Sequence, residues 1–261
     1  MNIQEQLFRC KRDGLTIRGA QYLPNNFKEN EKYPAVIVSH GFTGNYMEMA
    51  EYCRDFAKMG YVTYSFSFCG GSSLEVDDRL KSDGKTTDMT ILTEVEDLIA
   101  VKNYVKSQPF VDTENLILAG FSQGGFVSGL TAAKCGEEIK KLIMIYPALC
   151  IPDHARSGCL AGASYDPQNV PEMIDCGGTV LGKKFHETVA GMDSYVELSA
   201  YHGPVFILQG LEDDIVNYSY AIRAKENYAE NQCHLELIQN LGHGFNKEQW
   251  ANAFARIRQF L

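Results

Sequence analysis

The sequence predicts an α/β fold with a mostly parallel central sheet, helices on both faces and one inserted segment. Short apolar runs alternate with amphipathic runs of helical spacing along most of the chain, which is typical of parallel strands joined by helical crossovers. One such unit, residues 116–125, reads as a strand, a glycine-flanked turn at Ser122 and a helix. The alternation stops at residue 148 and resumes at residue 204. We therefore expect a core made of residues 1–147 and 204–261 and an inserted cap made of residues 148–203.

The chain opens with an expected antiparallel hairpin. Residues 6–10 and 15–22 alternate polar and apolar side chains on either side of Asp13-Gly14, a strong short-range hairpin signal. The elements expected after it are the strands 35–39, 61–66, 116–119, 141–146, 204–208 and 233–238 and the helices 46–58, 88–108, 126–134, 218–230 and 247–260. In such a fold the chemistry lies at the carboxyl ends of the strands.

The longest expected helix begins with Asp88 as its N-cap and ends at Gln108-Pro109. Its apolar positions keep the 3.6-residue period. They are Leu92, Val95, Leu98, Ile99 and Val105.

Two irregular segments are expected to determine the substrate specificity. Residues 69–85 form a polar loop rich in glycine and serine, longer than most connections in compact domains. The cap carries aromatic side chains that look exposed in the sequence pattern. They are Tyr165, Phe185, Tyr195 and Tyr201.

Composition and charge exclude some classes of partner. With 24 basic and 33 acidic residues, the net charge of −9 argues against a nucleic-acid or anionic-membrane surface, since both attract clustered Lys and Arg. No segment reaches the 18 apolar residues of a membrane span, and residues 1–10 lack a signal-peptide pattern. We expect a cytoplasmic protein.

The eight cysteines are expected to be free thiols. They are scattered through predicted strands and helices and form no C-x-x-C pair, which favours a reducing compartment. The sequence supports no metal site, and we expect no cofactor.

Ser122 is the candidate nucleophile, and it needs a base to activate its hydroxyl. Among six histidines, only His243 lies in a glycine-flanked loop after the last expected strand. His234 lies within a strand beside Glu236 and is expected to be solvated. His40 is expected to brace the loop that follows it, and the other three histidines belong to the cap or its edge.

The base needs an orienting carboxylate, and three acids compete for that role. Glu212, Asp213 and Asp214 all follow the strand 204–208, so all three reach the carboxyl edge of the sheet. The resulting chain order of serine, acid and histidine matches that of one hydrolase fold and differs from the orders of two other serine-protease folds.

These motifs resemble the α/β-hydrolase superfamily over nearly the whole chain. The sequence is most similar to its cinnamoyl or feruloyl esterase-like members, on the strength of segments 40–45, 120–125, 82–84 and 165–171. The resemblance implies that Asp213 is the triad aspartate, because Gly210 and Val216 match the family's G-x-x-D-x-x-V. It also implies that His243 is the base and that the backbone N–H groups of Phe42 and Gln123 form the oxyanion hole.

The chain departs from this family around the substrate. Phe121 and Gln209 stand where the family commonly has histidine. Feruloyl-type relatives read a phenolic hydroxyl with polar cap residues that align with His154, Ala161 and Phe185, our candidate substrate-binding residues. Two of the three are apolar here, which argues against recognition of that hydroxyl.

The function expected from these observations is that of a serine carboxylesterase. It would hydrolyse small, partly apolar esters through an acyl-enzyme, with aryl or hydroxycinnamoyl esters as the first choice. The alternatives are a lipase-like enzyme acting on monoacylglycerols, a serine peptidase, and a non-catalytic ligand receptor on the same scaffold. The expected partner is a small-molecule ester, without nucleic acid or membrane; the oligomeric state stays open, a homodimer among the options.

Overall fold

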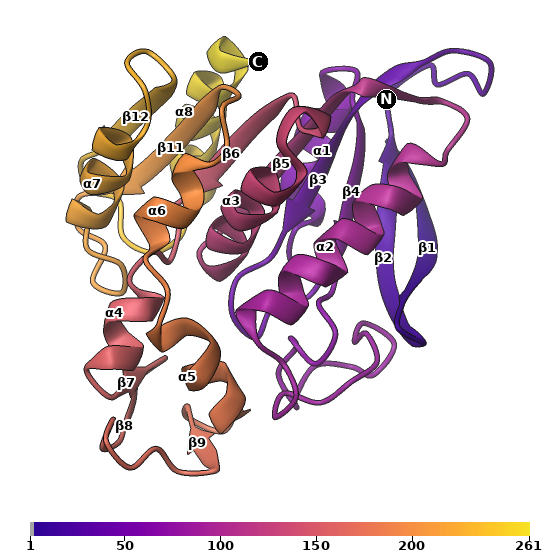
Figure 1. Ribbon diagram of the computed structural model, residues 1–261. Helices are drawn as coiled ribbons and strands as arrows, with labels where there is room; N and C mark the ends of the chain where they lie inside the picture. The colour runs from indigo at the N-terminus through magenta and orange to yellow at the C-terminus, as the bar shows by residue number, and fades with distance from the viewer. Residues whose placement is uncertain (1–2) are drawn as a thin grey trace.

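Eight strands form one twisted sheet, and most of them are parallel (Figure 1). The computed structural model describes residues 3–261. Met1 and Asn2, which belong to the predicted core and to the stretch 1–10 discussed above, lie outside the described residues. The strand order is β1-β2-β4-β3-β5-β6-β11-β12, and only the pairs β1–β2 and β2–β4 are antiparallel. The strands are β1 (Gln4–Arg12), β2 (Leu15–Leu23), β3 (Tyr33–Ser39), β4 (Val62–Phe66), β5 (Val111–Phe121), β6 (Lys141–Ile145), β11 (Val205–Gly210) and β12 (Cys233–Ile238). The predicted mostly parallel sheet is confirmed.

The amino-terminal hairpin also forms as predicted. Asp13 and Gly14 join β1 to β2 with φ of 48° and 85°, the two left-handed residues that a tight hairpin turn requires. The hairpin lies at the antiparallel edge of the sheet.

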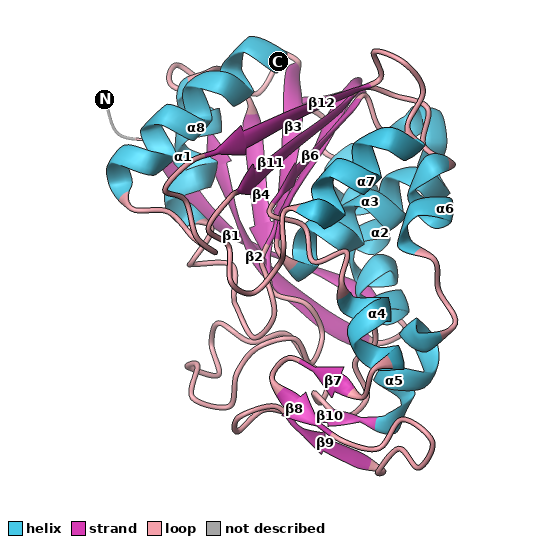
Figure 2. Cartoon of the chain, turned by 90° about the vertical axis from the view of Figure 1, so that its left-hand side faces the viewer, coloured by secondary structure: helices cyan, strands magenta, loops and turns pink. Residues whose placement is uncertain are grey.

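Helices cover both faces of the sheet (Figure 2). On one face α1 and α8 pack, and on the other α2, α3 and α7 pack, each face with its own cluster of buried apolar side chains. Strands buried on both sides carry no polar face, which explains the continuous apolar runs of β3, β5, β6 and β11. The helices are α1 (Ala50–Lys58), α2 (Ile91–Lys106), α3 (Gln123–Cys135), α7 (Ser219–Asn227) and α8 (Lys247–Phe260).

The prediction that Asp88 caps the long helix α2 is wrong. Thr90 is the N-cap: its backbone is extended, its side chain accepts a hydrogen bond from the Thr93 N–H, and the Thr93 hydroxyl accepts one from the Thr90 N–H. This reciprocal pair satisfies two backbone donors at once. Asp88 lies in the preceding turn, where its N–H donates to Lys85.

The buried face of α2 also differs from the predicted apolar stripe. Leu92 is 50% exposed, whereas Glu94 and Asp97 are almost fully buried. Val95, Leu98 and the other apolar positions pack as expected, but the face that touches the sheet is rotated so that two carboxyl groups face inward. Both carboxyls make hydrogen bonds there, which compensates for their burial.

Residues 148–203 lie between β6 and β11 and contain only short elements. They are α4 (Ile151–Arg156), β7 (Cys159–Leu160), β8 (Ala163–Ser164), β9 (Met173–Asp175), β10 (Val180–Gly182), α5 (Lys183–Ala190) and α6 (Ser194–Ser199). The strands form two small hairpins. Most of this segment lies at the carboxyl end of the parallel strands, at the same end as the loop 69–85 (Figures 1 and 2).

The aromatic side chains of this segment are not exposed, contrary to the sequence pattern. Phe185, Tyr195 and Tyr201 are buried in the larger apolar cluster of the core, and Tyr165 is half-buried. A segment of such short elements has no core of its own, so its large side chains pack against the main one.

Candidate active site

Ser122 lies at a strained turn between β5 and α3. Its φ of 52° and ψ of −120° are rare for a residue with a side chain. The surroundings hold this conformation: the Ser122 N–H donates to Ile145, and the Ser122 carbonyl accepts from Gly125, Phe126 and Ala148. The turn presents the hydroxyl at the carboxyl edge of the sheet, as a nucleophile elbow does.

Glycines at 120 and 124 make this turn sterically possible. A Cβ atom on Gly120 would lie 2.1 Å from the carbonyl oxygen of Gly124, and one on Gly124 would lie 2.2 Å from that of His40. Both contacts are with backbone, which cannot swing away. The strand, the helix and the loop after β3 therefore approach more closely than side chains would permit.

His243 brings the predicted serine and aspartate together. Its Nε2 lies 2.9 Å from the Ser122 Oγ, and its Nδ1 lies 2.8 Å from the Asp213 Oδ2. A carboxylate can only accept, so Nδ1 carries the proton and Nε2 is free to accept the serine proton. The three side chains come from the turns after β5, β11 and β12.

Asp213, and not its acidic neighbours, reaches His243. Glu212 and Asp214 are exposed, whereas Asp213 is buried and accepts two further hydrogen bonds at Oδ1 from the N–H groups of Ile215 and Val216. Burial acts to raise the Asp213 pKa, but the bonds from His243 and the backbone outweigh it and hold the pKa below its ordinary value. The group is therefore a carboxylate at neutral pH.

Gln209 also lies beside this constellation, although its sequence context predicts no role for it there. Its Nε2 donates to the Asp213 Oδ2 at 2.9 Å and to the Val216 carbonyl at 3.1 Å, from a fully buried side chain. The available signal was a polar residue near the end of an otherwise apolar strand. It holds the turn that carries Asp213.

The backbone N–H groups of Phe42 and Gln123 flank Ser122. Gln123 directly follows it as the first residue of α3, and a Cβ on Gly41 would lie 3.2 Å from the Ser122 Cβ, so the Gly41-Phe42 chain passes beside the serine. Neither N–H has an acceptor within residues 3–261. Two unpaired backbone donors, one at the start of α3 and one in the loop after β3, suit a developing negative charge.

His40 braces the Phe42 loop, as predicted. Its Nε2 accepts from the Phe68 N–H at 3.1 Å, so its Nδ1 carries the proton and donates to the Gly41 carbonyl at 2.6 Å. Complete burial lowers the pKa of His40 to about 4, with the bond to Gly41 opposing the shift. His40 is therefore neutral, and it ties the Phe42 loop to the chain after β4.

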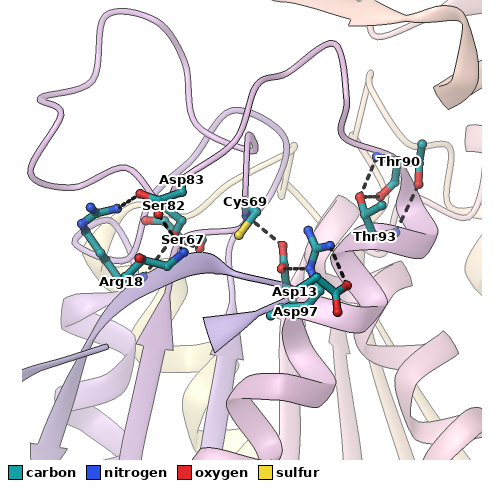
Figure 3. Close-up of polar contacts among 11 residues, drawn as sticks. Asp13, Arg18, Ser67, Cys69, Ser82, Asp83, Thr90, Thr93 and Asp97 are labelled. Atoms are coloured by element: carbon teal, nitrogen blue, oxygen red, sulfur yellow. Dashed lines mark hydrogen bonds and ion pairs between the residues drawn. The ribbon is translucent and has the colours of Figure 1, made fainter. Parts of the chain in front are cut away.

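The loop 69–85 is fastened at both of its ends (Figure 3). At its start, the Cys69 N–H donates to the Asp97 Oδ2 at 2.8 Å. At its end, Asp83 accepts from Arg18 and from the Thr16 N–H, both at 2.8 Å. These bonds, with that to Arg18 the largest influence, lower the Asp83 pKa to about 2. Anchored ends leave the exposed middle of the loop free to vary.

The predicted substrate residues of the 148–203 segment lie in three different settings. His154 is half-buried on α4, Ala161 is exposed in the turn between β7 and β8, and Phe185 is buried on α5. Within residues 3–261, no hydrogen bond joins any of them to the Ser122 constellation. Their role in substrate binding stays a prediction.

Tyr146 supports the His243 ring. It directly follows β6, and its ring centroid lies 4.6 Å from that of His243.

A groove of about 760 Å³ lies between α1 and α8, with Tyr52, Phe245 and Trp250 among its lining residues. Ser122, Asp213 and His243 do not line it, so it is not the site of an acyl group bound to Ser122.

The described residues offer neither a metal centre nor a membrane span. No group of three or more His, Cys, Asp and Glu side chains within residues 3–261 is arranged to hold a metal ion. In the same range, no helix is both long enough and apolar enough to cross a bilayer. All eight cysteines are unpaired.

The sheet order, the strained serine turn and the positions of the three polar side chains define an α/β-hydrolase. The family model of acetyl xylan esterase (AXE1) matches residues 6–258, so the chain belongs to the acetyl xylan esterase family. Est1E from Butyrivibrio proteoclasticus, with ferulic acid bound, superimposes with a TM-score of 0.84 at 29% identity over 95% of each chain. The predicted fold and the predicted class, a carboxylic ester hydrolase, are confirmed.

One further solved structure and one curated relative are also similar to this chain. An acetyl xylan esterase from Paenibacillus sp. R4 shares the fold, with a TM-score of 0.68 and 18% identity over all of this chain and 90% of the other. A probable dipeptidyl-peptidase 5 from Aspergillus terreus is 30% identical over 128 residues, which are 46% of this chain. The chain spans 17% of the length of that curated relative.

Proposed function

We propose that this protein is a serine carboxylesterase in which Ser122 is the nucleophile, His243 the general base and Asp213 its orienting carboxylate. The observation that carries the proposal is the position of the His243 ring, within hydrogen-bonding distance of Ser122 Oγ at 2.9 Å and of Asp213 at 2.8 Å. A receptor needs no such activated hydroxyl, which argues against a purely binding role.

The first half of the reaction makes an acyl-enzyme. His243 Nε2 takes the Ser122 proton while Oγ forms a bond to the ester carbonyl carbon, and the carbonyl electron pair moves onto its oxygen. The N–H groups of Phe42 and Gln123 stabilise this oxyanion, one such donor being worth about 3 to 4 kcal/mol. The intermediate then collapses: the bond to the alkoxy group breaks, and the protonated His243 gives its proton to the departing alcohol.

The second half repeats these steps with water. His243 takes a proton from water as its oxygen attacks the acyl carbon, and the bond to Ser122 Oγ breaks with return of the proton to that oxygen. The products are the carboxylic acid and the free enzyme. Asp213, a carboxylate at neutral pH, stabilises the imidazolium in both halves.

The proposed substrates are small acyl esters, with acetyl and hydroxycinnamoyl esters as the two candidates. The family match supports acetyl esters, and the ferulic acid complex of the 29% identical Est1E supports hydroxycinnamoyl esters. Apolar Ala161 and Phe185, at the positions aligned with the polar residues of feruloyl-type relatives, favour an acyl group without a phenolic hydroxyl. We therefore put acetyl esters ahead of hydroxycinnamoyl esters.

The test combines a covalent probe with a substrate panel. A fluorophosphonate probe should label wild-type protein and leave Ser122→Ala unlabelled, and p-nitrophenyl acetate should be cleaved faster than p-nitrophenyl ferulate, which has the same leaving group. A folded wild type that resists the probe would point to the receptor instead. Faster cleavage of the ferulate ester would reverse the order of the two acyl groups.

A peptidase is the second candidate, since the 128-residue match to a probable dipeptidyl-peptidase favours it. An ester and an amide need the same constellation, but an amide has the poorer leaving group. Assay with dipeptidyl p-nitroanilides decides between them: turnover comparable to that of p-nitrophenyl acetate would make the protein a peptidase.

The proposal includes a reducing cytoplasmic location and a small-molecule partner. Eight unpaired cysteines and a net charge of −9 support it, since the charge disfavours nucleic acid and anionic lipid. Cell fractionation would locate the protein, and recovery with the membrane or nucleoid fraction would contradict this part. Sedimentation would give the oligomeric state, for which a homodimer is one option.

A further inference from the structure

Glu94 is a buried carboxyl group that the reaction above does not use. It lies on α2 with 1% of its surface exposed, and its Oε2 accepts a hydrogen bond from the Gln123 Nε2 at 2.8 Å. Within residues 3–261, no cation pairs with it, in contrast to Asp97 one turn further along, which binds Arg12 at 2.6 Å. The negative charge of Asp97 also acts on Glu94.

Ionising a buried carboxyl group that has no cation beside it destabilises the folded protein. Burial, and then the negative charge of Asp97, raise the Glu94 pKa well above its ordinary value, although the bond from Gln123 opposes this. The raised pKa favours the protonated form of Glu94, and its Oε2 accepts the Gln123 N–H. An apolar side chain would fill the same space at lower cost, so packing alone does not account for a glutamate here.

The position of Glu94 links two parts of the site. Gln123 carries one of the two oxyanion N–H groups, and its side chain makes no hydrogen bond within residues 3–261 other than that to Glu94. On the opposite side, a Cβ on Gly71 would lie 3.5 Å from the Glu94 Oε1, so the start of the loop 69–85 lies directly on the carboxyl.

The same stretch of loop is tied to the second oxyanion donor. The Ser73 N–H donates to the Thr43 carbonyl at 3.0 Å, and the Ser72 hydroxyl donates to the Gly44 carbonyl at 2.8 Å, next to Phe42. Residues 71–73 thus contact the Phe42 loop directly and face Gln123 through Glu94.

We infer that Glu94 is a positioning residue that fixes Gln123, and with it the direction of the Gln123 backbone N–H in the oxyanion hole. The carbonyl of the peptide between Ser122 and Gln123 accepts from the N–H groups of Gly125, Phe126 and Ala148, and this peptide follows a strained residue with ψ of −120°. The Glu94 bond adds a constraint at the Gln123 side chain, which limits rotation of the residue that carries the N–H. This inference rests on the proposed function, because it assigns the amide the role of oxyanion donor.

The experiment compares Glu94→Gln, Glu94→Leu and Leu98→Ala. Gln keeps a neutral carbonyl acceptor, Leu removes it at similar volume, and Leu98 is a fully buried α2 residue that serves as a control for loss of stability. For Glu94→Leu we expect kcat for p-nitrophenyl acetate to fall about 10- to 100-fold with KM within twofold, because the lost interaction acts in the transition state. Glu94→Gln should restore kcat to within about threefold of wild type. Leu98→Ala should lower the melting temperature without changing kcat.

The rate at which a fluorophosphonate labels Ser122 provides a second readout that needs no correct ester. It should fall in Glu94→Leu and recover in Glu94→Gln, since the phosphoryl oxygen occupies the same oxyanion hole. Equal labelling and equal kcat in wild type and Glu94→Leu would overturn the inference while leaving the esterase proposal intact. A loss in Glu94→Gln as large as in Glu94→Leu would overturn it too. A wild type that neither labels nor hydrolyses esters would overturn both proposals.

Discussion

At the scale of single residues, environment separates side chains that the sequence makes look equivalent. Three consecutive acidic residues follow β11, and all three lie at the carboxyl edge of the sheet, where the candidate site is. Only Asp213 turns inward, where it receives bonds from His243, Gln209 and two backbone N–H groups. The sequence alone left three candidates open, and the family resemblance selected the one that the structure brings to His243.

Asp213→Asn should lower kcat roughly 10³- to 10⁴-fold, because an amide favours the wrong imidazole tautomer and cannot stabilise the imidazolium. Asp214→Asn is the matched control: its carboxylate is exposed, so we expect kcat within twofold of wild type. Steady-state hydrolysis of p-nitrophenyl acetate measures both. Similar losses in the two variants would mean that the loop can exchange one aspartate for the other.

His40 should make stability depend on pH through its buried neutral ring. Its pKa is about 4 in the folded protein, against an ordinary histidine value of 6.5, so below pH 6.5 the unfolded chain binds a proton that the folded protein does not bind. The stabilisation is complete above pH 6.5 and is lost as pH falls toward 4. We expect the urea-unfolding free energy to fall over this window, and to fall less steeply in His40→Gln.

His186 titrates in the same sense, because burial also lowers its pKa, so a shallower slope should remain in His40→Gln. Identical slopes between pH 6.5 and 4.5 in wild type and His40→Gln would show that another group carries the effect. Activity at pH 7 reports separately whether the glutamine still braces the Phe42 loop.

At the scale of elements, hydrophobic periodicity predicted where strands and helices lie but not which helix face is buried. The apolar stripe of α2 pointed to Leu92, yet Leu92 is half exposed, and Glu94 and Asp97 face inward. Periodicity counts apolar side chains and takes no account of a carboxyl whose partners come from β1, from the loop after β4 or from α3. The cap was placed at Asp88 because aspartate is a preferred N-cap residue, a preference that does not reveal the reciprocal bonds between Thr90 and Thr93 two residues further on.

Gln209 ties the end of β11 to the turn that carries Asp213, and this element-level contact can be tested. Gln209→Leu removes one hydrogen bond to a charged group, worth roughly 1.5 kcal/mol, so we expect about a tenfold loss of kcat. Gln209→His should retain most of the activity, because a ring N–H can still donate to Asp213. Full activity in Gln209→Leu would show that His243 and the backbone suffice to orient the carboxylate.

At the scale of the whole molecule, the site lies where segments distant in sequence meet at one edge of the sheet. The parallel sheet and the order of serine, aspartate and histidine follow from local patterns, and so they were predictable. Local patterns could not predict the contact between the 148–203 segment and the turn after the loop 69–85. That contact depends on one close approach between residues 95 positions apart. A Cβ on Gly182, at the start of α5, would lie 2.1 Å from the carbonyl oxygen of Thr87.

Gly182→Ala should therefore separate these two parts of the molecule. The backbone of Gly182 has φ of −79° and ψ of 155°, which alanine adopts freely, so the cost comes only from the collision with Thr87. Overpacking of this kind costs roughly 1 to 3 kcal/mol, or roughly 2 to 4 °C in melting temperature per kcal/mol for a chain of this size. We also expect KM for ester substrates to change more than kcat, because the Ser122 turn is untouched.

Gly191→Ala at the other end of α5 is the matched control. No atom lies within 4 Å of the position that its Cβ would take, and its φ of −86° suits alanine. It should leave the melting temperature and KM unchanged. If Gly182→Ala behaves like Gly191→Ala in both measurements, the contact with Thr87 does not fix the 148–203 segment. A lower melting temperature with unchanged KM would mean that the junction stabilises the fold without shaping the ester site.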